Sequence, residues 1–177
     1  MQDLIRDEPV ATAAIAVALG GMATILGAWF FQYVLGYPPC PLCLQQRIPY
    51  YVAIPLAVAV AVGALARWPR QLLALGLAAI AVTMLGSAGL AAYHAGVEWK
   101  WWPGPQSCGA ALGDFGPGTN LLERVQSVRI VRCDEAAWRF LGLSLAGWNV
   151  LISLALAAIA AAGALTLRRQ GSSSVSQ

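Results

Sequence analysis

The sequence predicts an all-α membrane protein, a bundle of four transmembrane helices. Of its 177 residues 59% are hydrophobic and only 11% are charged, whereas soluble globular domains carry roughly 25% charged residues. The charged residues are also confined, which leaves four stretches without any: 11–46, 48–66, 71–97 and 140–167. Each stretch is close to or longer than the ~20 residues that cross a hydrocarbon core as a helix.

Each stretch is expected to form one helix, because a helix satisfies its own backbone hydrogen bonds in lipid and these runs are too long for barrel strands. The first run should remain as a helix, since it is too long for a cleaved secretory signal and Arg6 stands among acidic residues. We expect a single integral membrane domain, 1–170, and a disordered tail, 171–177. The expected helices lie near 10–34, 48–66, 72–93 and 145–167.

The start of the second helix is open between two alternatives. If the helix begins near Pro41, Arg47 lies one turn beyond Cys43 on the same face, and Pro49 kinks the helix nearby. If it begins near Gln46, Pro49 falls in the first turn, where proline is tolerated.

Four crossings place both termini on one side of the membrane and the connections 36–47 and 98–144 on the other, so all four cysteines share one side. Counting basic residues, five against six, does not decide the orientation. Arg67 and Arg70 lie in a very short connection, and Arg168 and Arg169 abut a helix end, which favours cytoplasmic termini. The cysteines would then face the oxidising compartment, where disulfides persist.

The long loop, 98–144, is expected to contain a short surface helix. The loop opens with three tryptophans typical of an interfacial belt. Asn120 and Glu123 then resemble a capping box, and Leu121, Leu122, Val125 and Val128 share one helical face. Such a helix lies on the bilayer or packs on the loop itself.

The cysteines form two pairs of different spacing, Cys40 with Cys43 and Cys108 with Cys133. Disulfides that only staple the fold would contribute about 2 kcal/mol for the short loop and about 3.5 for the long one, so redox exchange is favoured for the first pair. A four-cysteine zinc cage is the second alternative, although a zinc ribbon has two close pairs. Haem attachment is excluded because Leu44 stands where histidine is needed.

The surroundings of Cys43 favour redox chemistry. A thiolate at a helix start meets unpaired N–H groups, which lower its pKa, and Cys43 is expected there. Arg47 can donate a hydrogen bond to a carbonyl oxygen of a lipid-soluble acceptor, or it reaches the lipid headgroups. His94, the only histidine, lies at the same depth and can supply a second donor or a proton, or is merely interfacial.

These features follow one another in an order that resembles the DsbB family of disulfide bond formation proteins. The order is a CxxC pair after the first helix, an arginine four residues later, a cysteine pair 25 apart, and the run Trp138-Arg139-Phe140-Leu141-Gly142-Leu143. The resemblance covers nearly the whole chain. It implies a bacterial inner-membrane thiol oxidase that reoxidises a soluble periplasmic DsbA-like dithiol oxidoreductase and passes the electrons to a quinone, ubiquinone or menaquinone.

The resemblance also implies a role for each cysteine. Cys108 and Cys133 would meet the partner, with the mixed disulfide at Cys108, and the released Cys133 would attack Cys40. Cys43 would then be the thiolate against the quinone. The family varies inside its CxxC pair, and here Pro41 stiffens that turn.

Arg47 matches the quinone-contacting arginine of the family, and His94 matches a position near the quinone. Two other functions stay open. A vitamin K epoxide reductase type of enzyme also links cysteine pairs to quinones, but its two pairs occur in the reverse order. A membrane scaffold with structural disulfides would have cysteines that resist mild reductant and ignore quinone.

Overall fold

A computed structural model describes residues 2–105, 108 and 132–173 of the chain. Helix α1, Gln2–Trp29, continues as a π-helical turn, η1, Phe30–Val34. Helices α2, Pro41–Gln45, and α3, Ile48–Leu65, follow, and then α4, Arg70–Glu98. Strands β1, Arg139–Phe140, and β2, Leu143–Ser144, precede the last helix, α6, Leu145–Ser173. The expected surface helix at 120–128 lies outside the described residues.

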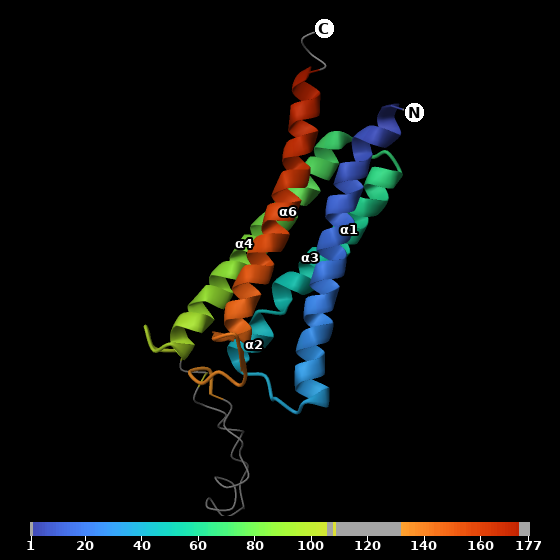
Figure 1. The fold of residues 1–177 in the computed structure, drawn as a ribbon. Helices are drawn as coiled ribbons and strands as arrows, with labels where there is room; N and C mark the ends of the chain where they lie inside the picture. Colours follow the sequence, from blue (N-terminus) through green and yellow to red (C-terminus); the bar gives the residue numbers. More distant parts are fainter. Residues whose placement is uncertain (1, 106–107, 109–131, 174–177) are drawn as a thin grey trace, which may run out of the picture.

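Four helical segments in the described part of the chain are long and apolar enough to cross a membrane: 9–34, 41–65, 70–98 and 145–167. The predicted fold class, a multi-pass helical membrane protein, is therefore confirmed. Figure 1 shows that α1 begins and α6 ends at the same end of the bundle, while α2 and the β1–β2 hairpin lie at the opposite end. The described cysteines thus gather at one end of the molecule.

Three helices run further than the sequence suggested. Helix α1 begins at Gln2, before the expected start near residue 10. Helix α4 continues past Tyr93 to Glu98, because no proline interrupts the chain before Pro103. Helix α6 continues to Ser173, so residues 171–173, expected in the tail, are helical. Leucine, arginine and glutamine just before them are good helix formers. The rest of the expected tail, 174–177, lies outside the described residues.

The second crossing is broken in two, which combines the two alternatives for its start. Pro41 occupies the first turn of α2 and Pro49 the first turn of α3. Pro49 has no N–H with which to continue the hydrogen-bond ladder of α2, so the helix ends and restarts. Gln46 and Arg47 form the turn between them, which places two polar side chains at the membrane edge beside the cysteine pair.

The core of the bundle is built from small and medium apolar residues. Helix α4 packs along α6, and α1 packs against α3. A Cβ atom added to Gly163 would lie 3.0 Å from the Ala13 Cβ and 3.1 Å from Leu77, so only glycine permits this approach of α6. Small residues let membrane helices pack closely, and this packing fixes the positions of α4 and α6 below the cysteines.

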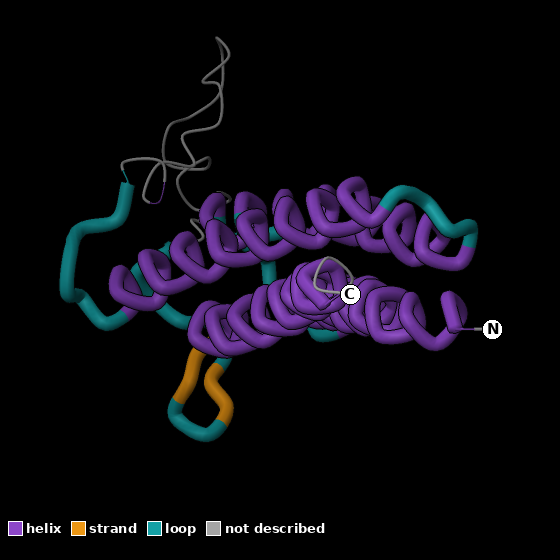
Figure 2. The backbone as a smooth tube through the Cα atoms, turned by 90° about the horizontal axis from the view of Figure 1, so that it is seen from above, coloured by secondary structure: helices purple, strands orange, loops and turns teal. Residues whose placement is uncertain are grey.

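The run Trp138 to Leu143 forms a two-stranded hairpin in which Phe140 pairs with Leu143. Its turn residues, Leu141 and Gly142, both have positive φ, 51° and 82°, as tight hairpin turns require. The hairpin projects from the side of the bundle at the start of α6 (Figure 2). Trp148 of α6 donates its indole N–H to the Phe140 carbonyl over 3.1 Å and ties the hairpin to the helix.

Candidate redox site

Cys40 and Cys43 lie at the N-terminus of α2. Cys40 is the N-cap residue with extended backbone, and its sulfur accepts a hydrogen bond from the backbone N–H of Cys43 over 3.2 Å. The two sulfurs are 2.7 Å apart. Cys40 is only 3% exposed, whereas Cys43 is half-buried. The pair is therefore close enough to cycle between dithiol and disulfide with small side-chain movements.

Hydrogen-bond donors converge on Cys40, whereas the sequence placed the lowered pKa at Cys43. A hydrogen bond from the Cys43 thiol, which has the largest effect, and one from His94 lower the pKa of Cys40 to about 5, although burial acts in the opposite direction. The backbone N–H of Cys43, which donates to Cys40 as the helix N-cap, adds a smaller effect in the same direction. Cys43 is the donor in this arrangement.

His94 projects from the last turns of α4 against this cysteine pair. Its Nε2 atom is 3.6 Å from the Cys40 sulfur and 3.9 Å from Oε1 of Glu98. Its Nδ1 atom is 2.6 Å from Nε2 of Gln46. The ring is 3% exposed, so the expectation of a merely interfacial histidine does not describe its position.

A continuous hydrogen-bonded network leads from His94 into the bundle. Asn149 of α6 donates to Oε1 of Gln46 over 2.7 Å, and the Tyr50 hydroxyl of α3 donates to Oδ1 of Asn149 over 2.6 Å. Tyr50 also meets Ser153 at 2.9 Å, and Ser153 donates to Ser87 over 3.0 Å. Polar groups buried in a membrane bundle need such partners, and here side chains of α3, α4 and α6 provide them for one another.

Arg47 is held in place by a second polar residue of the first crossing. Its Nη1 atom donates to Oε1 of Gln32, in η1, over 2.8 Å. The side chain is thus partly buried and directed to another helix, which differs from an arginine that reaches only for headgroups. Both Arg47 and Cys43 face a common cavity.

This cavity has a volume of about 750 Å³ and lies between α1, η1, α2, α6 and the hairpin. Most of its wall is apolar, from Ile25, Ala28, Phe31 and Ile152 among others, and the polar side chains that line it include Cys40, Cys43, Arg47, His94 and Glu98. Small-molecule sites typically combine apolar walls with a few placed polar groups in 300–1,000 Å³. The residues therefore fit an aromatic, lipid-soluble molecule whose carbonyl oxygens need donors.

The second cysteine pair forms a disulfide, Cys108–Cys133, the pairing that the resemblance implied. Cys133 is fully buried. Both cysteines of the disulfide belong to one hydrophobic cluster with Cys40, Leu42 and Val97. The two cysteine pairs are therefore packed together, although they are far apart in the sequence.

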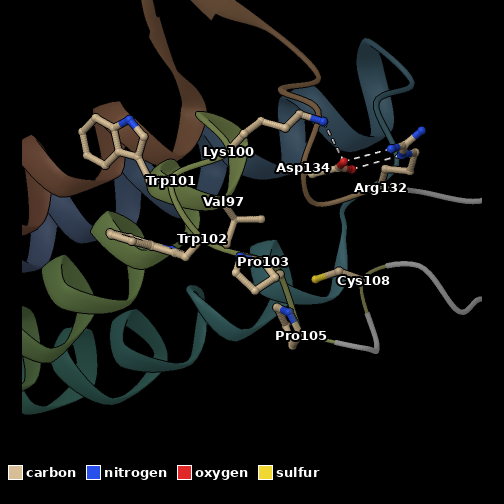
Figure 3. A pocket seen from close by; sticks show the side chains of 10 residues that line it. Val97, Lys100, Trp101, Trp102, Pro103, Pro105, Cys108, Arg132 and Asp134 are labelled. Atoms are coloured by element: carbon tan, nitrogen blue, oxygen red, sulfur yellow. Dashed lines mark hydrogen bonds and ion pairs between the residues drawn. The ribbon is translucent and has the colours of Figure 1, made fainter.

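A groove of about 500 Å³ opens beside the disulfide (Figure 3). Trp101, Trp102, Pro103 and Pro105 line it together with Cys108. An exposed ion pair network, Lys100 and Arg132 with Asp134, forms one rim. Hydrogen bonds from Arg132 and Lys100 hold the pKa of Asp134 well below its usual range. The disulfide thus borders an accessible, partly aromatic surface.

The sequence reasoning missed the polar residues that surround the cysteines: Gln32, Gln46, Glu98, Asn149 and Ser153. Their signal was available, because polar residues inside transmembrane stretches usually face a bundle interior or a functional cavity. Glu98 is the sharpest case. It is 8% exposed, and its Oε2 atom has no hydrogen-bond partner.

The zinc alternative can be compared with this geometry. A four-cysteine cage does not form, because the sulfurs of Cys108 and Cys133 are bonded to one another. Cys40, Cys43 and His94 do bring three donor atoms within 4.8 Å of one another. Among the described residues this is the one such group. Whether Nε2 of His94 can bind a metal depends on whether it carries a hydrogen, and therefore on the hydrogen bond at Nδ1.

Fold and site together define a class: a multi-pass membrane protein with a buried cysteine pair in reach of a disulfide. The sequence profile of the DsbB family, disulfide bond formation protein DsbB, matches residues 10–163, and the chain belongs to this family. Disulfide bond formation protein B of Albidiferax ferrireducens is 33% identical over 79% of this chain and 83% of its own. Disulfide bond formation protein B 2 of Pseudomonas aeruginosa is also 33% identical, over 77% and 80%. No solved structure matches the chain significantly.

Proposed function

We propose that the protein is a thiol oxidase that reoxidises a periplasmic DsbA-like dithiol oxidoreductase and passes the electrons through its two cysteine pairs to a membrane quinone. The observation that carries the proposal is the packing of both pairs in one hydrophobic cluster beside an apolar cavity. Family membership supports a disulfide-forming membrane protein. The quinone and the partner are the finer part of the proposal.

The relay consists of thiolate–disulfide exchanges. A thiolate of the reduced partner attacks Cys108, forms a mixed disulfide and releases Cys133 as a thiolate. Cys133 attacks Cys40 of the oxidised pair and releases Cys43. In a full cycle the partner loses two electrons and two protons as its dithiol becomes a disulfide, and both cysteine pairs return to their oxidised form.

A quinone supplies an acceptor of those two electrons and two protons, which the cycle needs because a DsbA-type partner is itself a strong oxidant at about −120 mV. The protein's own residues would hold it. Arg47, fixed by Gln32, directs N–H donors into the cavity beside Cys43. The apolar wall excludes water, which strengthens hydrogen bonds to a carbonyl oxygen.

The proposal includes the location, the bacterial inner membrane with both termini cytoplasmic and the cysteines periplasmic. The short connection with Arg67 and Arg70 supports this orientation. A single integral domain, 1–170, is part of the same proposal. Ubiquinone and menaquinone are equally compatible with the proposal, since both present two carbonyl oxygens on a planar quinone ring.

The test is quinone reduction, followed by absorbance, with purified protein and a reduced DsbA-like partner. Native protein should turn over, and Cys43→Ser should not. Thr83→Ala is the matched control, because its exposed hydroxyl bonds only within its own helix, to Ala79. Absence of turnover with several partners and both quinone types would contradict the proposal and favour a membrane scaffold with structural disulfides.

A further inference from the structure

The orientation of the Gln46 side-chain amide is fixed by a backbone carbonyl. One end of this amide lies 3.4 Å from the carbonyl oxygen of Leu42 and 2.6 Å from Nδ1 of His94. A carbonyl oxygen only accepts hydrogen bonds, so the group beside it must be the NH₂ group of Gln46. The same NH₂ group therefore donates to Nδ1 of His94.

The other end of the amide agrees with this orientation. Oε1 of Gln46 accepts from Nδ2 of Asn149 over 2.7 Å, and Oδ1 of Asn149 accepts from the Tyr50 hydroxyl over 2.6 Å. Turning Gln46 around would set its NH₂ group against the NH₂ group of Asn149 unless Asn149 turned with it, which the Tyr50 hydroxyl permits because it can also accept. In either case the Leu42 carbonyl oxygen would face the Gln46 oxygen, one acceptor against another, so the observed orientation is the satisfied one.

This orientation decides which nitrogen of His94 carries hydrogen. An Nδ1 atom that accepts a hydrogen bond is unprotonated, so a neutral ring carries its hydrogen on Nε2. Nε2 faces the Cys40 sulfur at 3.6 Å and Oε1 of Glu98 at 3.9 Å. Two further groups face this site: the Cys43 thiol contacts the Cys40 sulfur, and the backbone of Cys133 is a hydrogen-bond partner of the His94 ring. A proton on both nitrogens would require the Gln46 amide to leave its place.

We propose that Gln46 is a positioning residue that keeps His94 a neutral donor, with its Nε2 hydrogen directed at the Cys40 thiolate. When Cys108 attacks Cys133 and breaks the Cys40–Cys133 disulfide of the relay, the Cys40 sulfur leaves with the electron pair of the broken bond. His94 stabilises that charge through a hydrogen bond and keeps its own proton. The same arrangement argues against a metal at Cys40, Cys43 and His94, since a ligating Nε2 would have to lose its hydrogen. The consequence for electron flow rests on the proposed function, whereas the protonation state of His94 does not.

The chain makes a direct test possible, because His94 is its only histidine. Protein labelled with ¹⁵N-histidine gives the signals of one imidazole, and these distinguish the protonated from the unprotonated nitrogen. In the reduced protein at neutral pH we expect hydrogen on Nε2 and none on Nδ1. A ring protonated on both nitrogens, or on Nδ1 alone, would overturn the proposal.

Gln46→Glu should reverse this result, because a carboxylate accepts from Nδ1 and cannot donate to it, so that Nδ1 becomes protonated. Gln45→Glu is the matched control. It adds the same charge one residue away on an exposed side chain, and its imidazole signals should equal those of the native protein. If Gln46→Glu leaves Nδ1 unprotonated, or if both variants protonate it, contact with Gln46 is not what sets the state of the ring.

The role of the neutral donor is tested at Cys40, with no quinone or partner present. Cys108→Ser, Cys133→Ser protein leaves only the Cys40–Cys43 pair, and thiolate absorbance then reports its titration. His94→Ala should raise the pKa of Cys40 by about one unit, as expected for loss of one hydrogen bond to a charged group. His94→Gln should keep it near the native value, because its amide reaches the place of Nε2 without a positive charge. If His94→Gln shifts the pKa as far as His94→Ala, the charge of the ring matters and the proposal fails, whether or not the oxidase function stands.

Discussion

Single polar residues inside otherwise apolar helices set the chemistry of the site. Cys40, which is only 3% exposed, receives hydrogen bonds from Cys43 and His94. Burial disfavours the thiolate and the hydrogen bonds favour it, and the hydrogen bonds have the larger effect. In the reduced pair the negative charge therefore lies on the sulfur of Cys40, the N-cap residue of α2.

The pH dependence of the reduced protein follows from the lowered pKa of Cys40. With a folded pKa of about 5 against ~8.5 in an unfolded chain, the thiolate contributes its full stabilisation above pH ~8.5. This contribution falls between pH ~8.5 and 5 and is absent below. Thiolate absorbance of the reduced pair should therefore be half-developed near pH 5. A midpoint above pH ~8 would contradict the hydrogen-bonded arrangement.

Gln32 is expected to matter for the quinone and not for the partner. Gln32→Leu removes the acceptor that holds Arg47, so the guanidinium loses its fixed direction into the cavity. We expect the KM for quinone to rise roughly tenfold, as for loss of about 1.4 kcal/mol of binding, with unchanged exchange between the partner and the Cys108–Cys133 disulfide. Gln45→Leu, an exposed neighbour of the site, is the control. Equal losses in both half-reactions would show general misfolding.

At the scale of elements, the apolar stretches predicted the four membrane crossings. They did not predict where the helices break or which polar residues bond to one another. The sequence placed two prolines near the second crossing, but only packing shows that Pro41 and Pro49 start separate helices with Gln46 between them. The position of Glu98 was missed for a related reason. Charge alone placed it in the loop, whereas α4 continues to Glu98, which lies one turn beyond His94 on the same helix.

The hairpin before α6 carries a testable strain. Leu141 adopts φ 51°, in the left-handed region that costs a non-glycine residue about 1–2 kcal/mol, whereas Gly142 at 82° avoids that cost. Gly142→Ala should lower stability by about 1 kcal/mol and the Tm by ~2–4 °C, and Leu141→Asn should raise the Tm slightly. Gly86→Ala, in helix α4 with open space around its Cα, is a control expected to be neutral or stabilising. Thermal unfolding in detergent measures all three, and a stabilising Gly142→Ala would contradict the turn geometry.

At the scale of the whole molecule, the chain joins two redox pairs that the sequence separates by more than 60 residues. Residue spacing gave the pairs, and the resemblance gave their order of use. Neither the spacing nor the resemblance could give the closeness of the two pairs, because it depends on tertiary packing between residues that are far apart in the chain. The cluster of Cys40, Leu42, Val97, Cys108 and Cys133 supplies that contact.

This closeness predicts which inter-pair disulfide forms. Cys43→Ser, Cys108→Ser protein keeps Cys40 and Cys133, which share the buried cluster, so mild oxidation should join them within one chain. Cys40→Ser, Cys108→Ser protein keeps Cys43 and Cys133 instead. Cys43 lies at the edge of the cluster and towards the cavity, so this link should form at least tenfold more slowly, as a difference of 1.4 kcal/mol in the barrier would give. Peptide mapping by mass spectrometry without reductant identifies each link. Equal rates, or a faster link to Cys43, would mean that the relay does not enter the second pair at Cys40.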